Sequence, residues 1–87
     1  MVTAKVKIIN PQGMHMRPAQ LFVNTMAPYQ CDITILFNGT SINAKSIMPL
    51  MAACIRQGSE IELQCSGEQE TEALRAAVEL IESGLGE

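Results

Sequence analysis

The sequence predicts an α+β fold in which one antiparallel sheet carries its helices on one face. Apolar and polar residues alternate in four segments, and apolar residues recur at helical spacing in three others. In chain order these segments read βαββαβα, and a single Asn-Gly pair divides two consecutive strand segments. That order fits a layer of helices packed on one antiparallel sheet.

The four strand segments have the period of a half-buried strand. The inward positions of three of them are Val2, Ala4, Val6 and Ile8; Cys31, Ile33, Ile35 and Phe37; and Ile61, Leu63 and Cys65, while Thr40 to Ala44 is expected to pair back as a short third strand. Asn38-Gly39 separates the second segment from the third. A type I′ turn needs positive φ at both central residues, which Asn and Gly accept, so a tight hairpin is predicted there.

Three segments place apolar residues along one helical face. The first has Ala19, Phe22, Val23 and Met26, with Pro18 in its first turn and Pro28 as its stop. The second is capped by Ser46, stops near Gly58, and has Ile47, Leu50, Met51 and Cys54. The third runs from about Glu70 to Ser83 and has Leu74, Ala77, Val78 and Ile81. Acidic residues lie in its first turn and Gly84 takes the C′ position.

Length and charge restrict the kind of protein. The 87 residues predict one domain over 1–87. A net charge of −3 with six Lys and Arg, and three aromatic residues, argues against nucleic-acid binding. No apolar run approaches the roughly 20 residues of a membrane span, and no signal-peptide core is seen at the N-terminus. We expect a cytoplasmic monomer with protein partners.

The cysteines predict neither a metal site nor a disulfide framework. Cys31, Cys54 and Cys65 are odd in number, lack metal-ligand spacing and fall on predicted apolar faces. We therefore expect reduced core thiols, no metal and no cofactor.

The strongest chemical signal is His15, the only histidine. If the first helix begins at Met16, His15 lies where unpaired N–H groups and the positive end of the helix dipole form an anion site. Arg17 adds a fork of donors suited to a phosphate. An imidazole that attacks phosphorus becomes a phosphohistidine, whose oxyanion these groups of Met16 and Arg17 would hold. Taken alone, such a residue is more often an ordinary loop histidine.

The residues on either side of His15 favour the phosphohistidine interpretation over an ordinary loop histidine. Gly13-Met14-His15-Met16-Arg17-Pro18-Ala19 resembles the active-site signature of HPr, the histidine-containing phosphocarrier family of the phosphoenolpyruvate-dependent sugar phosphotransferase system. The resemblance covers essentially the whole chain. It extends to Asn38-Gly39, Asn43-Ala44-Lys45-Ser46-Ile47-Met48, Gln57-Gly58, Glu60-Ile61 and Gly84-Leu85-Gly86-Glu87.

This resemblance implies both fold and function. It implies a two-layer, open-faced β-sandwich whose four strands lie in the order 1-4-2-3, with three helices on one face. It implies that His15 accepts a phosphoryl group from phospho-enzyme I through Nδ1 and passes it to the A domains of sugar permeases. Such a protein is a carrier with a covalent intermediate rather than a turnover enzyme. The alternatives are an HPr-like regulatory protein, or a carrier for a nitrogen-related or dihydroxyacetone-kinase branch.

Ser46 has two interpretations. A serine at this position is by default an N-cap. The resemblance implies that an ATP-dependent HPr kinase/phosphorylase phosphorylates it, which creates a corepressor for a catabolite-control repressor. The chain departs from the family at Pro49, usually glycine or polar, and at Ala52-Ala53-Cys54, commonly Ser-Leu-Gly. Both departures lie in the segment that partners read.

Flexible methionines near His15 suggest a docking surface. Met14, Met16 and Met48 lie off the buried helix stripe or in a loop, and thioether side chains suit a surface that repacks against several partners. Ile47, beside Met48 at the start of the second helix, is assigned to the same docking surface. Met51 falls on the stripe and is assigned to the core. The alternative is that these are scattered exposed apolar residues.

Overall fold

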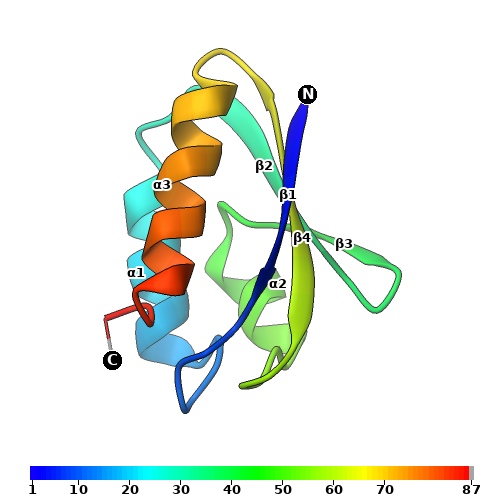
Figure 1. Cartoon of the computed structure of the whole chain (residues 1–87), viewed down its shortest axis with the longest axis vertical. Coiled ribbons are helices and arrows are strands. Elements are labelled where there is room, and N and C mark those ends of the chain that lie inside the picture. The colour runs from blue at the N-terminus through cyan, green and yellow to red at the C-terminus, as the bar shows by residue number, and fades with distance from the viewer. Residues whose placement is uncertain (87) are drawn as a thin grey trace.

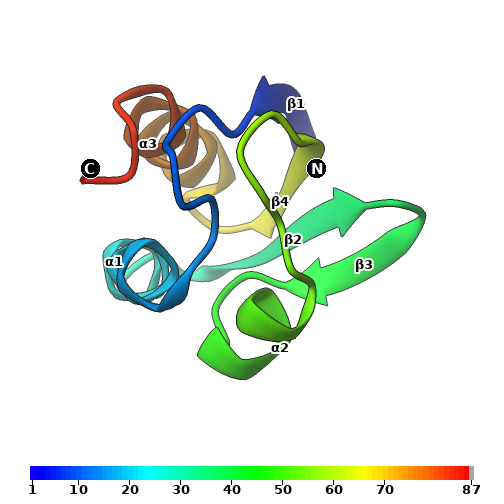
Figure 2. The ribbon, with the colours of Figure 1, turned by 90° about the horizontal axis from the view of Figure 1, so that it is seen from below.

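One antiparallel sheet with helices on a single face makes up the structure (Figures 1 and 2). The computed structural model describes residues 1–86, so Glu87, the end of the predicted domain and C-terminal motif, lies outside the described residues. The elements are β1 (Val2–Lys7), α1 (Met16–Met26), β2 (Cys31–Phe37), β3 (Thr40–Asn43), α2 (Ile47–Ala52), β4 (Glu60–Gly67) and α3 (Glu70–Glu82). The strand order is β1-β4-β2-β3. The predicted α+β fold, its βαββαβα order and its open-faced sheet are confirmed.

The alternation of the strands sets the two faces of the sheet. β4 lies between β1 and β2, with Val6 opposite Ile61 and Ile35 opposite Leu63. Most inward residues of these strands are buried and Val2, Ala4 and Phe37 are half-buried, while charged pairs such as Lys5 and Glu62 lie opposite each other on the outer face. The helices cover the apolar face because only that face offers a surface to bury.

The hairpin between β2 and β3 forms as predicted. Asn38 and Gly39 have φ of 51° and 77°, the positive values that a type I′ turn requires. Phe37 then pairs with Thr40, and Ile35 with Ile42.

The end of α3 is a Schellman motif. Gly84 has φ of 94°, its N–H donates to the Ile81 carbonyl at 3.1 Å, and the Leu85 N–H donates to the Leu80 carbonyl at 3.0 Å. The predicted C′ role of Gly84 is therefore confirmed. The buried face of the helix is rotated from the predicted one, because Ala73 is buried and Leu74 is only half-buried.

The second helix is shorter than predicted. It ends at Ala52 rather than near Gly58, and Cys54 has φ of 54°, a left-handed conformation that stops the helical path. Cys54 is exposed, so its assignment to the buried stripe and to the core thiols was wrong. Cys31 and Cys65 are buried thiols as predicted. Burial raises the pKa of Cys65 to about 11 and also raises the pKa of Cys31.

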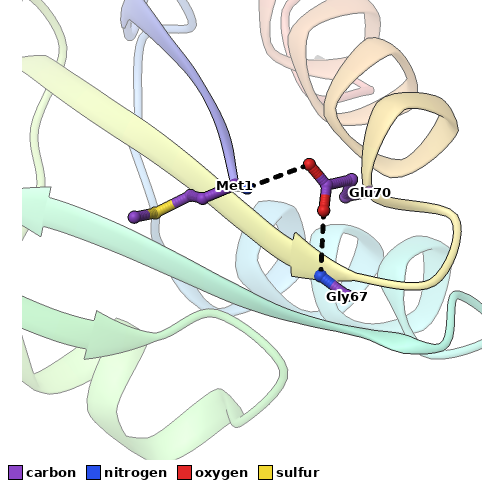
Figure 3. Close-up of polar contacts among 3 residues, drawn as sticks. All are labelled: Met1, Gly67 and Glu70. Atoms are coloured by element: carbon purple, nitrogen blue, oxygen red, sulfur yellow. Dashed lines mark hydrogen bonds and ion pairs between the residues drawn. The ribbon is translucent and has the colours of Figure 1, made fainter.

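A polar contact joins the start of β1 to the β4–α3 connection (Figure 3). The Glu70 carboxylate accepts the Gly67 N–H at 3.1 Å and pairs with the Met1 amino group at 3.2 Å. These contacts, the Gly67 bond first, lower the pKa of Glu70. Because the folded-state pKa is lowered, this contact stabilises the fold above the ordinary pKa of glutamate. The contribution disappears as the pH falls through the lowered value.

Candidate functional site

A buried turn sets the path of the chain into His15. The buried Asn10 side chain donates through Nδ2 to the Gly13 carbonyl at 2.7 Å, and the Gly13 N–H donates back to the Asn10 carbonyl at 3.1 Å. Gly13 has φ of 61°, and a Cβ there would lie 2.4 Å from the Ile55 carbonyl oxygen. Glycine is therefore required by both conformation and space.

Met14 anchors the next residue of the turn in the core. Its side chain is 3% exposed, and its N–H donates to the Ile55 carbonyl at 2.9 Å. This burial contradicts the assignment of Met14 to a docking surface. The sequence could not show it, because an apolar residue in a loop has no periodicity from which to tell its direction.

His15 occupies the N-cap of α1, as predicted. Its backbone is extended, with φ of −73° and ψ of −179°, and its carbonyl accepts the Ala19 N–H at 2.9 Å. The imidazole is exposed and makes no capping hydrogen bond to the helix. The first two helical N–H groups, those of Met16 and Arg17, have no intrahelical acceptor, and Pro18 has no N–H. His15 therefore directly precedes backbone donors to which its side chain makes no capping bond.

Two open depressions meet at His15. The first runs along α1 and is lined by Gln12, His15, Met16, Arg17, Gln20, Leu21 and Asn24. The second lies toward α2 and the loop after it, and is lined by Gln12, Met14, His15, Met51, Cys54, Ile55 and Arg56. The structure thus brings Arg17 to His15 as predicted. It also brings Arg56, which the sequence patterns did not single out.

The two chain segments that line the depressions at His15 contain no acidic residue. Segments 10–31 and 46–59 contain no Asp or Glu, and their charged side chains besides His15 are Arg17 and Arg56. The nine acidic residues all lie elsewhere, in a chain of net charge −3. Because these two segments lack carboxylates, their arginines give this part of the molecule a positive charge that favours anions. That distribution was the signal in the sequence that could have pointed to Arg56.

Ser46, Ile47 and Met48 lie at the start of α2, and Met16 lies at the start of α1, the helix against which α2 packs. Ser46 is the N-cap, with φ of −124° and ψ of 127°, but its hydroxyl makes no capping hydrogen bond. Met16 and Met48 are 60% and 73% exposed, while Ile47 is half-buried. For Met16, Ile47 and Met48 the docking surface stays a prediction.

Among residues 1–86, no three His, Cys, Asp or Glu side chains come together as metal ligands. No helix within that range has the length and apolar character needed to cross a membrane.

The fold and the exposed histidine at a helix start define a class of protein, and comparisons identify it. The family model described as "PTS HPr component phosphorylation site" matches residues 2–83. The phosphocarrier protein HPr of Neisseria meningitidis serogroup A is 36% identical over 87 residues, covering 100% of this chain and 98% of that protein.

Solved structures agree with the family match. HPr from Thermoanaerobacter tengcongensis is 40% identical with a TM-score of 0.96, covering 100% of this chain and 98% of that one. The Bacillus subtilis catabolite repression protein Crh is 36% identical with a TM-score of 0.77, covering 95% of each chain. The chain therefore belongs to the HPr family, the phosphocarriers of the phosphotransferase system.

Proposed function

We propose that His15 carries the phosphoryl group, which it accepts from phospho-enzyme I and passes to the A domains of sugar permeases. One observation carries the proposal. The only histidine of the chain is exposed at the N-terminus of α1, with its imidazole uncommitted to the helix and Arg17 in the same depression. An uncommitted imidazole beside cationic and N–H donors can both attack phosphorus and hold the product.

The transfer is a displacement at phosphorus. The Nδ1 lone pair of His15 forms a new N–P bond while the bond from phosphorus to enzyme I breaks, and the donor atom keeps the electron pair. The N–H groups of Met16 and Arg17, with the Arg17 guanidinium, stabilise the negative charge on the phosphoryl oxygens. The reverse displacement passes the group to the acceptor. His15 returns unchanged, so the protein is a carrier and not an enzyme that turns over alone.

A regulatory role through Ser46 is the second candidate. The likeness to Crh and the Ser46 hydroxyl, which makes no cap bond, support it. Its partners would be an HPr kinase/phosphorylase and a catabolite-control repressor. Carriers for a nitrogen-related or dihydroxyacetone-kinase branch use the same chemistry at His15, and their acceptors distinguish them.

Incubation with enzyme I and labelled phosphoenolpyruvate tests the proposal. The natural chain should gain one acid-labile, base-stable phosphoryl group. His15→Ala should gain none and should melt near the natural temperature, because an N-cap contributes only about 1 kcal/mol. Labelling retained in His15→Ala would place the phosphoryl group on another residue and contradict the proposal.

A further inference from the structure

A second arginine, Arg56, shares a depression with His15. Arg17 lines the depression along α1, and Arg56 lines the one toward α2, while His15 lines both. The imidazole therefore has a guanidinium in each of the two spaces into which a phosphoryl group could extend.

The backbone of Arg56 is held directly against the turn that carries His15. A Cβ on Gly13 would lie 2.7 Å from the Arg56 Cα, and the Met14 N–H donates to the Ile55 carbonyl at 2.9 Å. The two loops are thus in backbone contact at Arg56 itself and at the residues directly before His15 and Arg56. The position from which the Arg56 side chain extends is fixed relative to His15.

The loop that holds Arg56 is itself closed by hydrogen bonds. The Arg56 N–H donates to Ser59 Oγ at 3.2 Å, and the Ser59 N–H donates to the Arg56 carbonyl at 3.0 Å. Gly58 donates its N–H to the Ile8 carbonyl at 2.7 Å, and Gln57 Nε2 donates to the Ile9 carbonyl at 3.0 Å. These bonds tie the loop to the two residues that follow β1 and hold the backbone of Arg56 in place.

No acidic residue lines either depression, and the next carboxylate along the chain is Glu60, four residues after Arg56. Segments 10–31 and 46–59, which supply every residue lining the two depressions, contain no Asp or Glu. Over residues 1–86 no carboxylate forms an ion pair with Arg56. Its side chain is exposed, and its five N–H donors are available to an anion placed on His15.

We propose that Arg56 is a second phosphoryl-contacting residue, whose guanidinium donates to the phosphoryl oxygens on His15 in the phosphorylated chain. This inference rests on the proposed function. Phosphorylation places a nearly dianionic group on the His15 ring, and a guanidinium fork matches phosphate oxygens. Arg56 then stabilises the phosphorylated form and, within it, the dianion over the monoanion.

A titration without any partner protein tests the contact. His15 is phosphorylated chemically with phosphoramidate, and the phosphoryl group is titrated by ³¹P NMR in the natural chain and in Arg56→Gln. Loss of a nearby positive charge should raise the titration midpoint of the phosphoryl group by roughly 0.2 to 0.7 pH unit, the range expected for an exposed ion pair. Arg56→Lys should recover part of the shift, and Arg75→Gln, an exposed arginine on α3, should cause none.

The outcomes separate this inference from the proposed function. An unchanged midpoint in Arg56→Gln, with a shifted one in Arg17→Gln, would overturn it. Slower transfer from enzyme I with an unchanged midpoint would assign Arg56 to partner contact and would also overturn it. Failure of enzyme I to phosphorylate the natural chain would refute the proposed function, while the chemical titration would still report on Arg56. Thermal melting of each variant confirms that the fold is retained.

Discussion

The starts of α1 and α2 have the same local design and differ in chemistry. Each has an N-cap residue whose side chain makes no capping bond, His15 in one and Ser46 in the other, and each has a proline three residues later. Around His15 lie Arg17 and a buried glycine turn, and α1 has 11 residues. At Ser46 the N–H donates to the Asn43 carbonyl at 3.2 Å, the Lys45 N–H donates to Asn43 Oδ1 at 3.0 Å, and α2 has six residues.

This difference separates a transfer site from a modification site. An imidazole nitrogen has a lone pair ready to attack phosphorus, whereas a serine hydroxyl must first lose its proton to a base. Within the proposed function, His15 can therefore exchange a phosphoryl group reversibly with partners, and Ser46 depends on a kinase that supplies the base. The firmly held turn before α1 serves the first role, because transfer requires fixed geometry.

The largest expected effect concerns that turn. Gly13→Ala would place a Cβ 2.4 Å from the Ile55 carbonyl oxygen at a φ of 61°. We expect a loss of about 3 kcal/mol or more in the free energy of unfolding, measured by urea denaturation. Gly39→Ala is the matched control: its φ is 77° but nothing lies within 4 Å, so only about 1 kcal/mol should be lost. Equal losses would mean that the contact with Ile55 does not hold the turn.

Arg17→Ala addresses transfer rather than stability. If Arg17 stabilises the phosphoryl oxygens, the rate of transfer from enzyme I should fall by about tenfold to a hundredfold. The melting temperature should change little, since Arg17 is exposed. Rapid-quench kinetics with the labelled donor measures the rate. A rate equal to that of the natural chain would leave Arg17 as a solvated charge.

Cys54→Gly examines the end of α2. A cysteine at a φ of 54° carries a left-handed backbone penalty of about 1 kcal/mol that glycine avoids, and the HPr resemblance places glycine there. Cys54→Gly should therefore raise the free energy of unfolding by up to about 1 kcal/mol. Cys54→Ala keeps the penalty and should give no gain. Calorimetry on both variants would contradict this account if alanine stabilised as much as glycine.

The smallest and most specific effect concerns Pro49. In α2 this proline removes one N–H from the first turn and leaves those of Ile47 and Met48 to anchor a phosphate on Ser46. We expect Pro49→Gly to be phosphorylated severalfold faster by HPr kinase and ATP, because a charge-assisted bond is worth about 1.5 to 3 kcal/mol before desolvation. Pro49→Ala restores the N–H without the added flexibility of glycine. An equal or faster rate for the natural chain would show that the missing donor does not matter.

Periodicity in the sequence was enough to predict the sheet and two of the helices closely. Alternating apolar residues such as Ile61, Leu63 and Cys65 are buried on the face of the sheet that the helices cover. Asn38 and Gly39 both adopt positive φ, which is the conformation that a tight hairpin turn requires. The HPr resemblance then supplied the strand order.

Loops account for what the sequence could not predict. Met14 turns inward because Gly13 lies against Ile55, a contact between residues more than 40 positions apart. The left-handed Cys54 ends α2 early, although cysteine rarely signals such a conformation. Arg56 reaches the depression beside His15 through the same long-range contact, so no local pattern could have indicated it.

The central claim is that the imidazole of His15 carries the phosphoryl group. The most direct test is NMR of the chain labelled with ¹⁵N-histidine, phosphorylated by enzyme I and phosphoenolpyruvate. We predict a single phosphorus-coupled nitrogen, Nδ1 of His15, and loss of that coupling when a permease A domain is added. A phosphorylated chain with no phosphorus-coupled histidine nitrogen would contradict the account.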